Sequence, residues 1–161
     1  MEYIRLHIPT PASAAALFFA ALPKDQREER VFVLPLDGNG RPLAKPILVS
    51  AGHEDGTFAC REAIRLAERA KRESRIAVAR ARAQIDSGAI FREALKAGAE
   101  EIIVAHDHPS GDITPSKADI AVTKKLREAG ELLSVPLLDH LIIGRGTDGK
   151  PAFCSLAEVS S

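Results

Sequence analysis

Two histidines one residue apart, followed by a serine and an aspartate, are the residues of this 161-residue chain best suited to chemistry. His106 and His108 come where the apolar run 102–105 ends. In an extended backbone, residues i and i+2 point to the same side, so both imidazoles can reach one point. Ser116 and Asp119 follow a loop rich in proline and glycine, which can turn the chain sharply. Two imidazoles and one carboxylate would give zinc three ligands and leave a fourth position to water, as in catalytic sites.

Each part of this pattern also has a simpler interpretation. A His-x-His pair alone is a weak signal, and Ser116-x-x-Asp119 is a variant of the capping box that begins many helices. The order of strand, His-x-His, loop and helix start carries more weight, because sites in α/β sheets usually lie at the carboxyl ends of strands. Two other zinc patterns, HExxH and the HxE with PCxxC of nucleobase deaminases, are absent from the sequence.

The elements that must position these residues alternate between strands and helices. This order predicts a three-layer α/β domain, a mixed sheet flanked by helices. The turn residues Asp37 to Gly40 are typical of a hairpin, and Pro46 indicates an edge or a bulge in the strand that follows. The predicted strands are 3–8 (a short edge strand), 31–36, 43–50, 101–105 and 135–144, and the predicted helices are 10–22, 86–97 and 116–133.

The segment from Thr57 to Gln84 differs in composition from the rest. It contains no glycine or proline and is predicted to form one long helix. Residues 61–82 hold eight basic and three acidic residues. A helical wheel gathers five arginines on one side: Arg61, Arg65, Arg69, Arg72 and Arg75. A solvated surface helix is the simpler interpretation, and an arm that binds DNA or another acidic partner is the alternative.

Composition sets the broad class. Apolar residues make up 45% and charged residues 27% of the chain, as in a soluble globular domain, and the length favours one domain over residues 1–161. The 22 basic and 22 acidic residues cancel, so no net charge steers the chain to nucleic acid. Cys60 and Cys154 form no CxxC pair, which disfavours a cysteine zinc site and fits the cytoplasm. The apolar stretch 12–22 is too short to span a membrane.

The spacing of the candidate ligands resembles that of a known family. His106-x-His108, seven residues, Ser116, two residues and Asp119 resemble the JAMM signature of the MPN+ (JAB) metalloproteases. The RadC-like branch is similar in HDHPSGD, TPS and LLDHLIIG, and also in segments 29–37 and 90–95. The resemblance runs from about residue 11 to 156, apart from 57–84, which looks like an insertion. It implies the MPN/JAMM architecture, which is similar to that of cytidine deaminases.

The resemblance also implies roles for individual residues. It implies one zinc ion per chain, held by His106, His108 and Asp119. Glu29 matches the family's general base, and Ser116 matches the serine that steadies the oxyanion. Glu28 is the alternative base, although a slip of one residue would point it to the other face of the strand.

Five further positions need comment. Asp107 replaces the usual asparagine between the two histidines and is expected to bring another carboxylate beside the metal. Asp139 and His140 match a strand motif and are expected to have structural roles. His7 and His53 have no assigned role.

Three functions follow as hypotheses. The first is a zinc-dependent peptidase or isopeptidase that acts on a protein or peptide. The second is a DNA-repair or mobile-element accessory protein, which the arginine face would support. The third is a catalytically silent MPN scaffold, which the intact ligand set argues against.

Overall fold

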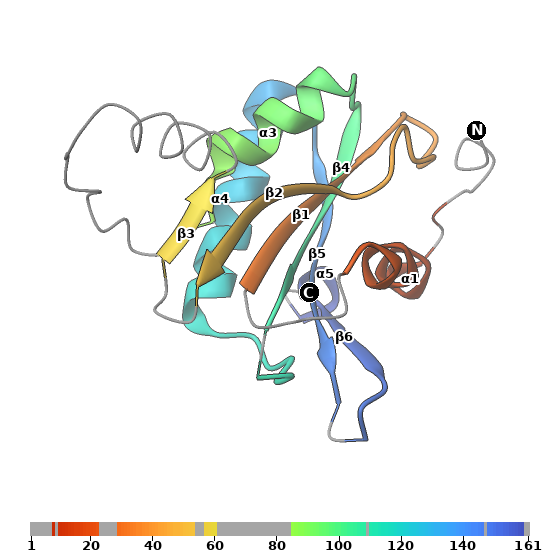
Figure 1. The fold of residues 1–161 in the computed structure, drawn as a ribbon. Helices are drawn as coiled ribbons and strands as arrows, with labels where there is room; N and C mark the ends of the chain where they lie inside the picture. The colour runs from red at the N-terminus through yellow and green to blue at the C-terminus, as the bar shows by residue number, and fades with distance from the viewer. Residues whose placement is uncertain are drawn as a thin grey trace, which may run out of the picture.

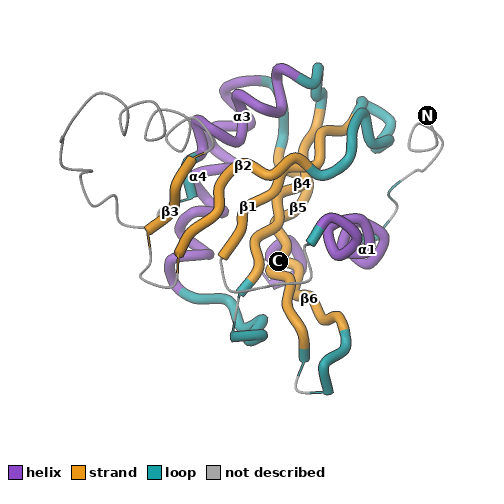
Figure 2. Tube along the Cα trace, in the orientation of Figure 1, coloured by secondary structure: helices purple, strands orange, loops and turns teal. Residues whose placement is uncertain are grey.

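The computed structural model describes residues 8, 10–22, 29–53, 57–60, 85–108, 110–146 and 148–159. Its strands form one six-stranded sheet in the order β3-β2-β1-β4-β5-β6 (Figures 1 and 2). β4 and β5 are parallel, and the other neighbouring strands are antiparallel, so the sheet is mixed. The strands are β1 (Glu29–Leu36), β2 (Ile47–His53), β3 (Thr57–Cys60), β4 (Glu101–Asp107), β5 (Leu137–Arg145) and β6 (Pro151–Ser155).

Helices cover both faces of this sheet, which confirms the predicted three-layer arrangement. α3 (Ser87–Lys96) and α4 (Lys117–Leu133) lie on one face, and α1 (Pro11–Ala21) lies on the other (Figure 1). The short α5 (Leu156–Val159) follows β6 directly. Side chains of a strand alternate between its two faces. Val31 and Val33 of β1 therefore join the core beneath α3 and α4, whereas Phe32 and Leu34 join the core beneath α1.

Side-chain caps explain where the helices begin. Thr10 accepts a hydrogen bond from the Ser13 N–H ahead of α1, and Asp86 accepts one from the Gly88 N–H ahead of α3. Ser116 begins α4 with a complete capping box. These signals are readable in the sequence, and all three predicted helices are present. In the part of the chain that the structure describes, no helix combines the length and the apolar character needed to cross a membrane.

The predicted long helix over 57–84 is wrong at its start. Thr57–Cys60 form β3, which pairs antiparallel with β2, and residues 61–84 lie outside the described residues. The absence of glycine and proline permits a helix but does not require one. Threonine and phenylalanine favour strands, and β2 offers an edge whose backbone groups need partners.

Smaller differences lie at other element boundaries. β2 begins after Pro46, later than predicted, and its register against β1 shifts between Val31 and Phe32, so the strand carries a bulge at Val49, three residues after Pro46. The turn at 37–40 is confirmed by a hydrogen bond from the Gly40 N–H to the Asp37 carbonyl. Of the predicted edge strand 3–8, only Ile8 is described, and it belongs to no strand. β6 and α5 were not predicted from the sequence.

Candidate metal centre

Strand alternation places Glu29 and His106 on the same face of the sheet. Glu29 has the parity of Val31 and Val33 in β1, and His106 has that of Val104 in β4. Val31 and His106 are direct partners across the two antiparallel strands. The start of β1 and the end of β4 therefore deliver both side chains to one edge, beneath the helix layer of α3 and α4.

His108 follows the end of β4, and the loop after it fixes its orientation. The His108 N–H donates to the Ile143 carbonyl of β5, and the His108 carbonyl accepts from the Gly111 N–H. The His108 Nδ1 lies 2.5 Å from the carbonyl oxygen of Asp112. A carbonyl oxygen can only accept, so Nδ1 carries the hydrogen and donates it. The Nε2 of neutral His108 is then left with a lone pair, which is the form that binds metals.

Asp119 is held by the cap of α4. The backbone N–H and the hydroxyl of Ser116 both donate to Asp119 Oδ2, at 2.8 and 2.6 Å. The Asp119 N–H in turn donates to Ser116 Oγ at 3.1 Å. Asp119 thus presents Oδ1 at 3.2 Å from His106 Nε2 and Oδ2 at 4.0 Å from His108 Nε2. Burial raises the pKa of Asp119, but the two hydrogen bonds from Ser116 lower it and favour the ionised carboxylate.

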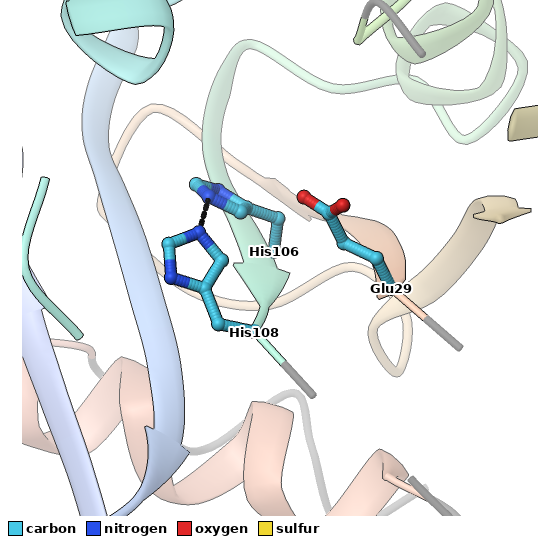
Figure 3. A group of neighbouring side chains, drawn as sticks. All are labelled: Glu29, His106 and His108. Atoms are coloured by element: carbon cyan, nitrogen blue, oxygen red, sulfur yellow. Dashed lines mark hydrogen bonds between the residues drawn. The ribbon is translucent and has the colours of Figure 1, made fainter. Parts of the chain in front are cut away.

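The three predicted ligands converge with spacings that suit zinc. The Nε2 atoms of His106 and His108 are 3.0 Å apart (Figure 3). Ligands about 2.0–2.1 Å from a tetrahedral zinc lie about 3.3 Å from one another. The separations of 3.0 Å between the two Nε2 atoms and 3.2 Å from His106 Nε2 to Asp119 Oδ1 are close to that value, and the other oxygen, Oδ2, lies 4.0 Å from His108 Nε2. Two imidazoles and an ionised carboxylate are also the chemical set that zinc prefers in catalytic sites. The donor set therefore fits the ion.

Glu29 approaches the same centre from β1. Its carboxylate points toward the two imidazoles in Figure 3, and the ligand atoms of Glu29, His106 and His108 lie within 4.8 Å of one another. Partial burial raises the pKa of Glu29, although His106 and His108 oppose the rise. A carboxylate with a raised pKa holds an accepted proton better, which is the property a general base needs. Glu29 is accordingly available either as a ligand or as a base.

Asp107 does not stand beside the metal centre, contrary to the expectation from the sequence. It has the opposite parity to His106 and points to the face that carries α1. Its carboxylate accepts a hydrogen bond from the Arg30 N–H and lies 3.4 Å from Arg30 Nη1. Burial raises the pKa of Asp107, and the hydrogen bond and charge of Arg30 oppose that rise. Strand alternation, which brought His106 and His108 together, is the reason that Asp107 points away.

His140 contacts the site, although the sequence suggested only a structural role. It lies on β5 opposite Val104 of β4, fully buried, with its Nε2 2.9 Å from His106 Nδ1. Its neighbour Asp139 faces the other side and has the expected structural role, since it accepts from Ser155 Oγ and the Ala157 N–H. The sequence does contain a signal, because His140 stands within a predicted apolar strand. Its use requires knowing that this strand lies next to the strand that ends in His106, and the sequence does not give the order of the strands.

Other residues singled out in the sequence lie beyond this description. Glu28, His7 and the arginines of 61–84 are outside the described residues, and nothing is described of the His53 side chain. The nucleic-acid partner, which rests on those arginines, stays a prediction.

Comparison with known proteins gives one family. The RadC-like JAB domain family matches residues 67–160, a range that includes both histidines, Ser116 and Asp119. The match begins inside 57–84, so the insertion remains a prediction.

Curated relatives carry the name UPF0758 protein. The one from Trichormus variabilis is 36% identical over 140 residues, which cover 85% of this chain and 46% of the relative. Those from Carboxydothermus hydrogenoformans and Clostridium perfringens are 55% identical over 62 residues and 58% identical over 55 residues. These shorter matches cover 38% and 34% of this chain, and 27% and 24% of the relatives. The chain spans less than half the length of these relatives.

Proposed function

We propose, since the chain belongs to the RadC-like JAB domain family, that it is a zinc-dependent hydrolase that cleaves peptide or isopeptide bonds. One observation carries the proposal. The Nε2 atoms of His106 and His108 and the Oδ1 of Asp119 face one another at 3.0 and 3.2 Å. His108 Nε2 and Asp119 Oδ1 are acceptors and both face His106 Nε2, so the three atoms repel one another unless a proton or a metal ion lies between them. A divalent metal would form a bond to each of the three.

The roles of the residues follow from their positions. His106, His108 and Asp119 would hold zinc. When bound, zinc lowers the pKa of a water molecule and polarises a carbonyl oxygen. Glu29 would accept the proton of the attacking water and pass it to the leaving amine, a role that its raised pKa supports. Glu29 comes from β1, whereas the three ligands come from the end of β4 and from α4, so Glu29 can accept the proton while they hold the metal.

Two roles compete for the hydroxyl hydrogen of Ser116. The predicted role, donation to the oxyanion of the tetrahedral intermediate, needs its hydrogen free. Its hydrogen is instead donated to Asp119 Oδ2 at 2.6 Å. The backbone N–H of Ser116 donates to the same oxygen at 2.8 Å, so the carboxylate keeps a partner if the hydroxyl rotates. We therefore assign Ser116 first to the orientation of Asp119, and to the oxyanion only after that rotation.

Zinc content is the first test. Elemental mass spectrometry of the purified chain should find about one zinc per chain, and the His108→Ala variant should lose it. Asp148→Asn is a suitable control, because Asp148 lies in the turn between β5 and β6, where it pairs with Lys150. That variant should keep its zinc. A wild-type protein free of metal after purification, and unable to take up added zinc, would contradict the proposal.

Hydrolysis is the second test. Peptide libraries and a lysine-linked isopeptide are suitable probes of cleavage. Glu29→Gln should reduce the cleavage rate by about 100–10,000-fold, the usual contribution of a general base, while zinc stays bound. Glu93→Gln alters a half-buried glutamate of α3 that pairs with Lys96, and it should change neither quantity. Equal rates for wild type and Glu29→Gln would remove Glu29 from the mechanism.

A further inference from the structure

His140 has no solvent exposure, and its ring lies between two side chains that bear on the metal centre. Its Nε2 is 2.9 Å from His106 Nδ1, and its Nδ1 is 2.7 Å from Thr123 Oγ1. The Thr123 hydroxyl also donates to the backbone carbonyl of Asp119 at 2.7 Å. A continuous chain of hydrogen bonds thus joins His106 to the residue that provides the third candidate ligand.

The position of each hydrogen along this chain of hydrogen bonds can be derived by starting at its Asp119 end. A carbonyl oxygen only accepts, so the single hydroxyl hydrogen of Thr123 is committed to Asp119. Thr123 Oγ1 must then accept from His140, which places a hydrogen on His140 Nδ1. In a neutral imidazole the other nitrogen is an acceptor. His140 Nε2 therefore accepts, and the hydrogen between the two histidines belongs to His106 Nδ1.

Two observations support a neutral His140. Its nitrogens contact a histidine and a threonine, and neither is a negatively charged partner. Its ring is also closed off from solvent, with 0% of the residue exposed. A charged imidazole in this place would lose its hydration without a partner to compensate.

We propose that His140 and Thr123 are positioning residues that hold the proton of His106 on Nδ1 and so keep its Nε2 bare for the metal. This inference rests on the proposed metal-binding function. It adds the residues that fix which nitrogen of His106 can bind. The chain of bonds also ties together β4, β5 and α4, the elements around the site, because Thr123 lies one helical turn after Asp119. Partners behind a ligand histidine commonly set its tautomer and its basicity.

The proposal predicts a specific rearrangement when the hydroxyl is removed. Thr123→Val has nearly the same shape but leaves His140 Nδ1 without an acceptor. His140 then gains by moving its hydrogen to Nε2, where it can donate to His106 Nδ1. That donation forces the hydrogen of His106 onto Nε2, which faces Asp119 Oδ1 at 3.2 Å and can donate to it. The nitrogen meant for the metal would be protonated.

Nitrogen NMR of the histidine-labelled, metal-free 161-residue chain measures this directly. Each imidazole tautomer has its own pair of nitrogen shifts, and a His106→Gln variant assigns the signals. Wild type and the matched control Thr123→Ser, which keeps the hydroxyl, should show His106 with its proton on Nδ1. Thr123→Val should show a large share of the Nε2–H form. Zinc affinity should fall about 10–100-fold in Thr123→Val and be retained in Thr123→Ser.

The outcomes separate this inference from the proposed function. A wild-type His106 protonated on Nε2 would overturn the inference, as would a Thr123→Val variant with unchanged tautomer and zinc affinity. The expected tautomers in a chain that binds no zinc would contradict the proposed function but leave the proton order standing. If Thr123→Val fails to fold, His140→Gln offers a second variant, because its amide oxygen can still accept from His106. It should retain the Nδ1–H form of His106.

Discussion

Two buried aspartates on neighbouring elements of this protein have opposite surroundings. Asp139 of β5 accepts hydrogen bonds from three donors: the His140 N–H at 2.7 Å, the Ala157 N–H at 3.1 Å and the Ser155 hydroxyl at 2.8 Å. Each contact neutralises part of the carboxylate charge. The result is a closed arrangement that fastens β5 to β6 and to the start of α5.

Asp119 is satisfied on one oxygen only. Its Oδ2 receives two hydrogen bonds from Ser116, whereas its Oδ1 faces an imidazole nitrogen that the hydrogen-bond chain through His140 leaves without a hydrogen. The two aspartates are equally deep, with 6% of Asp139 and 8% of Asp119 exposed. Burial therefore does not distinguish the structural aspartate from the candidate metal ligand. The chemical nature of their partners distinguishes them, because a carboxylate that faces other acceptors needs a cation.

Exchanging each aspartate for asparagine should break this comparison most clearly. Asp119→Asn removes a charged ligand, so its zinc affinity should fall by at least about 100-fold, more than the loss of an outer partner costs. Its metal-free stability should fall less than that of Asp139→Asn, because the N–H and hydroxyl of Ser116 can still donate to the amide oxygen. Asp139→Asn should keep its zinc but lose about 1–3 kcal/mol of unfolding free energy, since an amide NH₂ now meets donors.

Metal titration and urea denaturation measure the two quantities on the same preparations. The comparison fails if Asp139→Asn loses zinc while remaining folded. It also fails if Asp119→Asn is strongly destabilised without metal, which would mark Asp119 as another structural anchor.

A substitution that disturbs the packing of the loop after β4 against β5 should have the next largest effect on zinc affinity. Gly111 has a φ of +77°, and a Cβ there would lie 2.4 Å from the Arg145 carbonyl oxygen. Gly111→Ala should therefore push the loop from β5 and move His108, lowering zinc affinity by more than about 10-fold. Gly98 has a φ of +74° but open space around a Cβ. Gly98→Ala should cost only the left-handed strain, about 1–2 kcal/mol, and should leave zinc affinity unchanged.

The cap of α4 should give a smaller, mixed effect. Ser116→Ala removes the hydroxyl that donates to Asp119 and caps the helix, so we expect about 1 kcal/mol of lost stability and weaker zinc binding. Thr10 caps α1, away from the site, through the Ser13 N–H. Thr10→Ala should show a similar loss of stability in thermal denaturation but normal zinc affinity. Equal zinc affinity in both variants would show that the backbone N–H of Ser116 alone orients Asp119.

Much of this architecture could be predicted because its signals are local. His106, His108, Ser116 and Asp119 lie within 14 consecutive residues, and alternation and capping depend only on neighbours in the chain. The same local rules predicted the three helices and the central strands. Glu29 is distant in sequence, and only the family resemblance identified it.

What could not be predicted depends on the order of strands. His140 becomes part of the site because β5 lies parallel to β4, and Thr123 because α4 packs over both. Thr57–Cys60 became a strand because β2 presents an edge for pairing, which local composition does not reveal. Asp107 was misplaced for a different reason, since the alternation used for its two neighbours was not applied to it.

Asp107 offers the smallest expected effect and a third kind of carboxylate, buried against a cation. Burial raises its pKa above 3.8, so the folded chain binds more protons than the unfolded chain between 3.8 and the raised value. The unfolding free energy therefore falls as pH rises through that window, and the cost persists at higher pH. Asp107→Asn does not titrate and keeps an oxygen for the Arg30 N–H.

The stability of Asp107→Asn relative to wild type should thus improve between about pH 3.5 and pH 7, as measured by urea denaturation in metal-free buffer. Zinc affinity should be unchanged, because Asp107 points to the opposite face of β4. A relative stability that instead worsens with rising pH would mean that Arg30 outweighs burial and holds Asp107 charged. In that case Asp107 would resemble Asp139, as a carboxylate that its partners fully satisfy, and Asp119 alone would be left open to a metal.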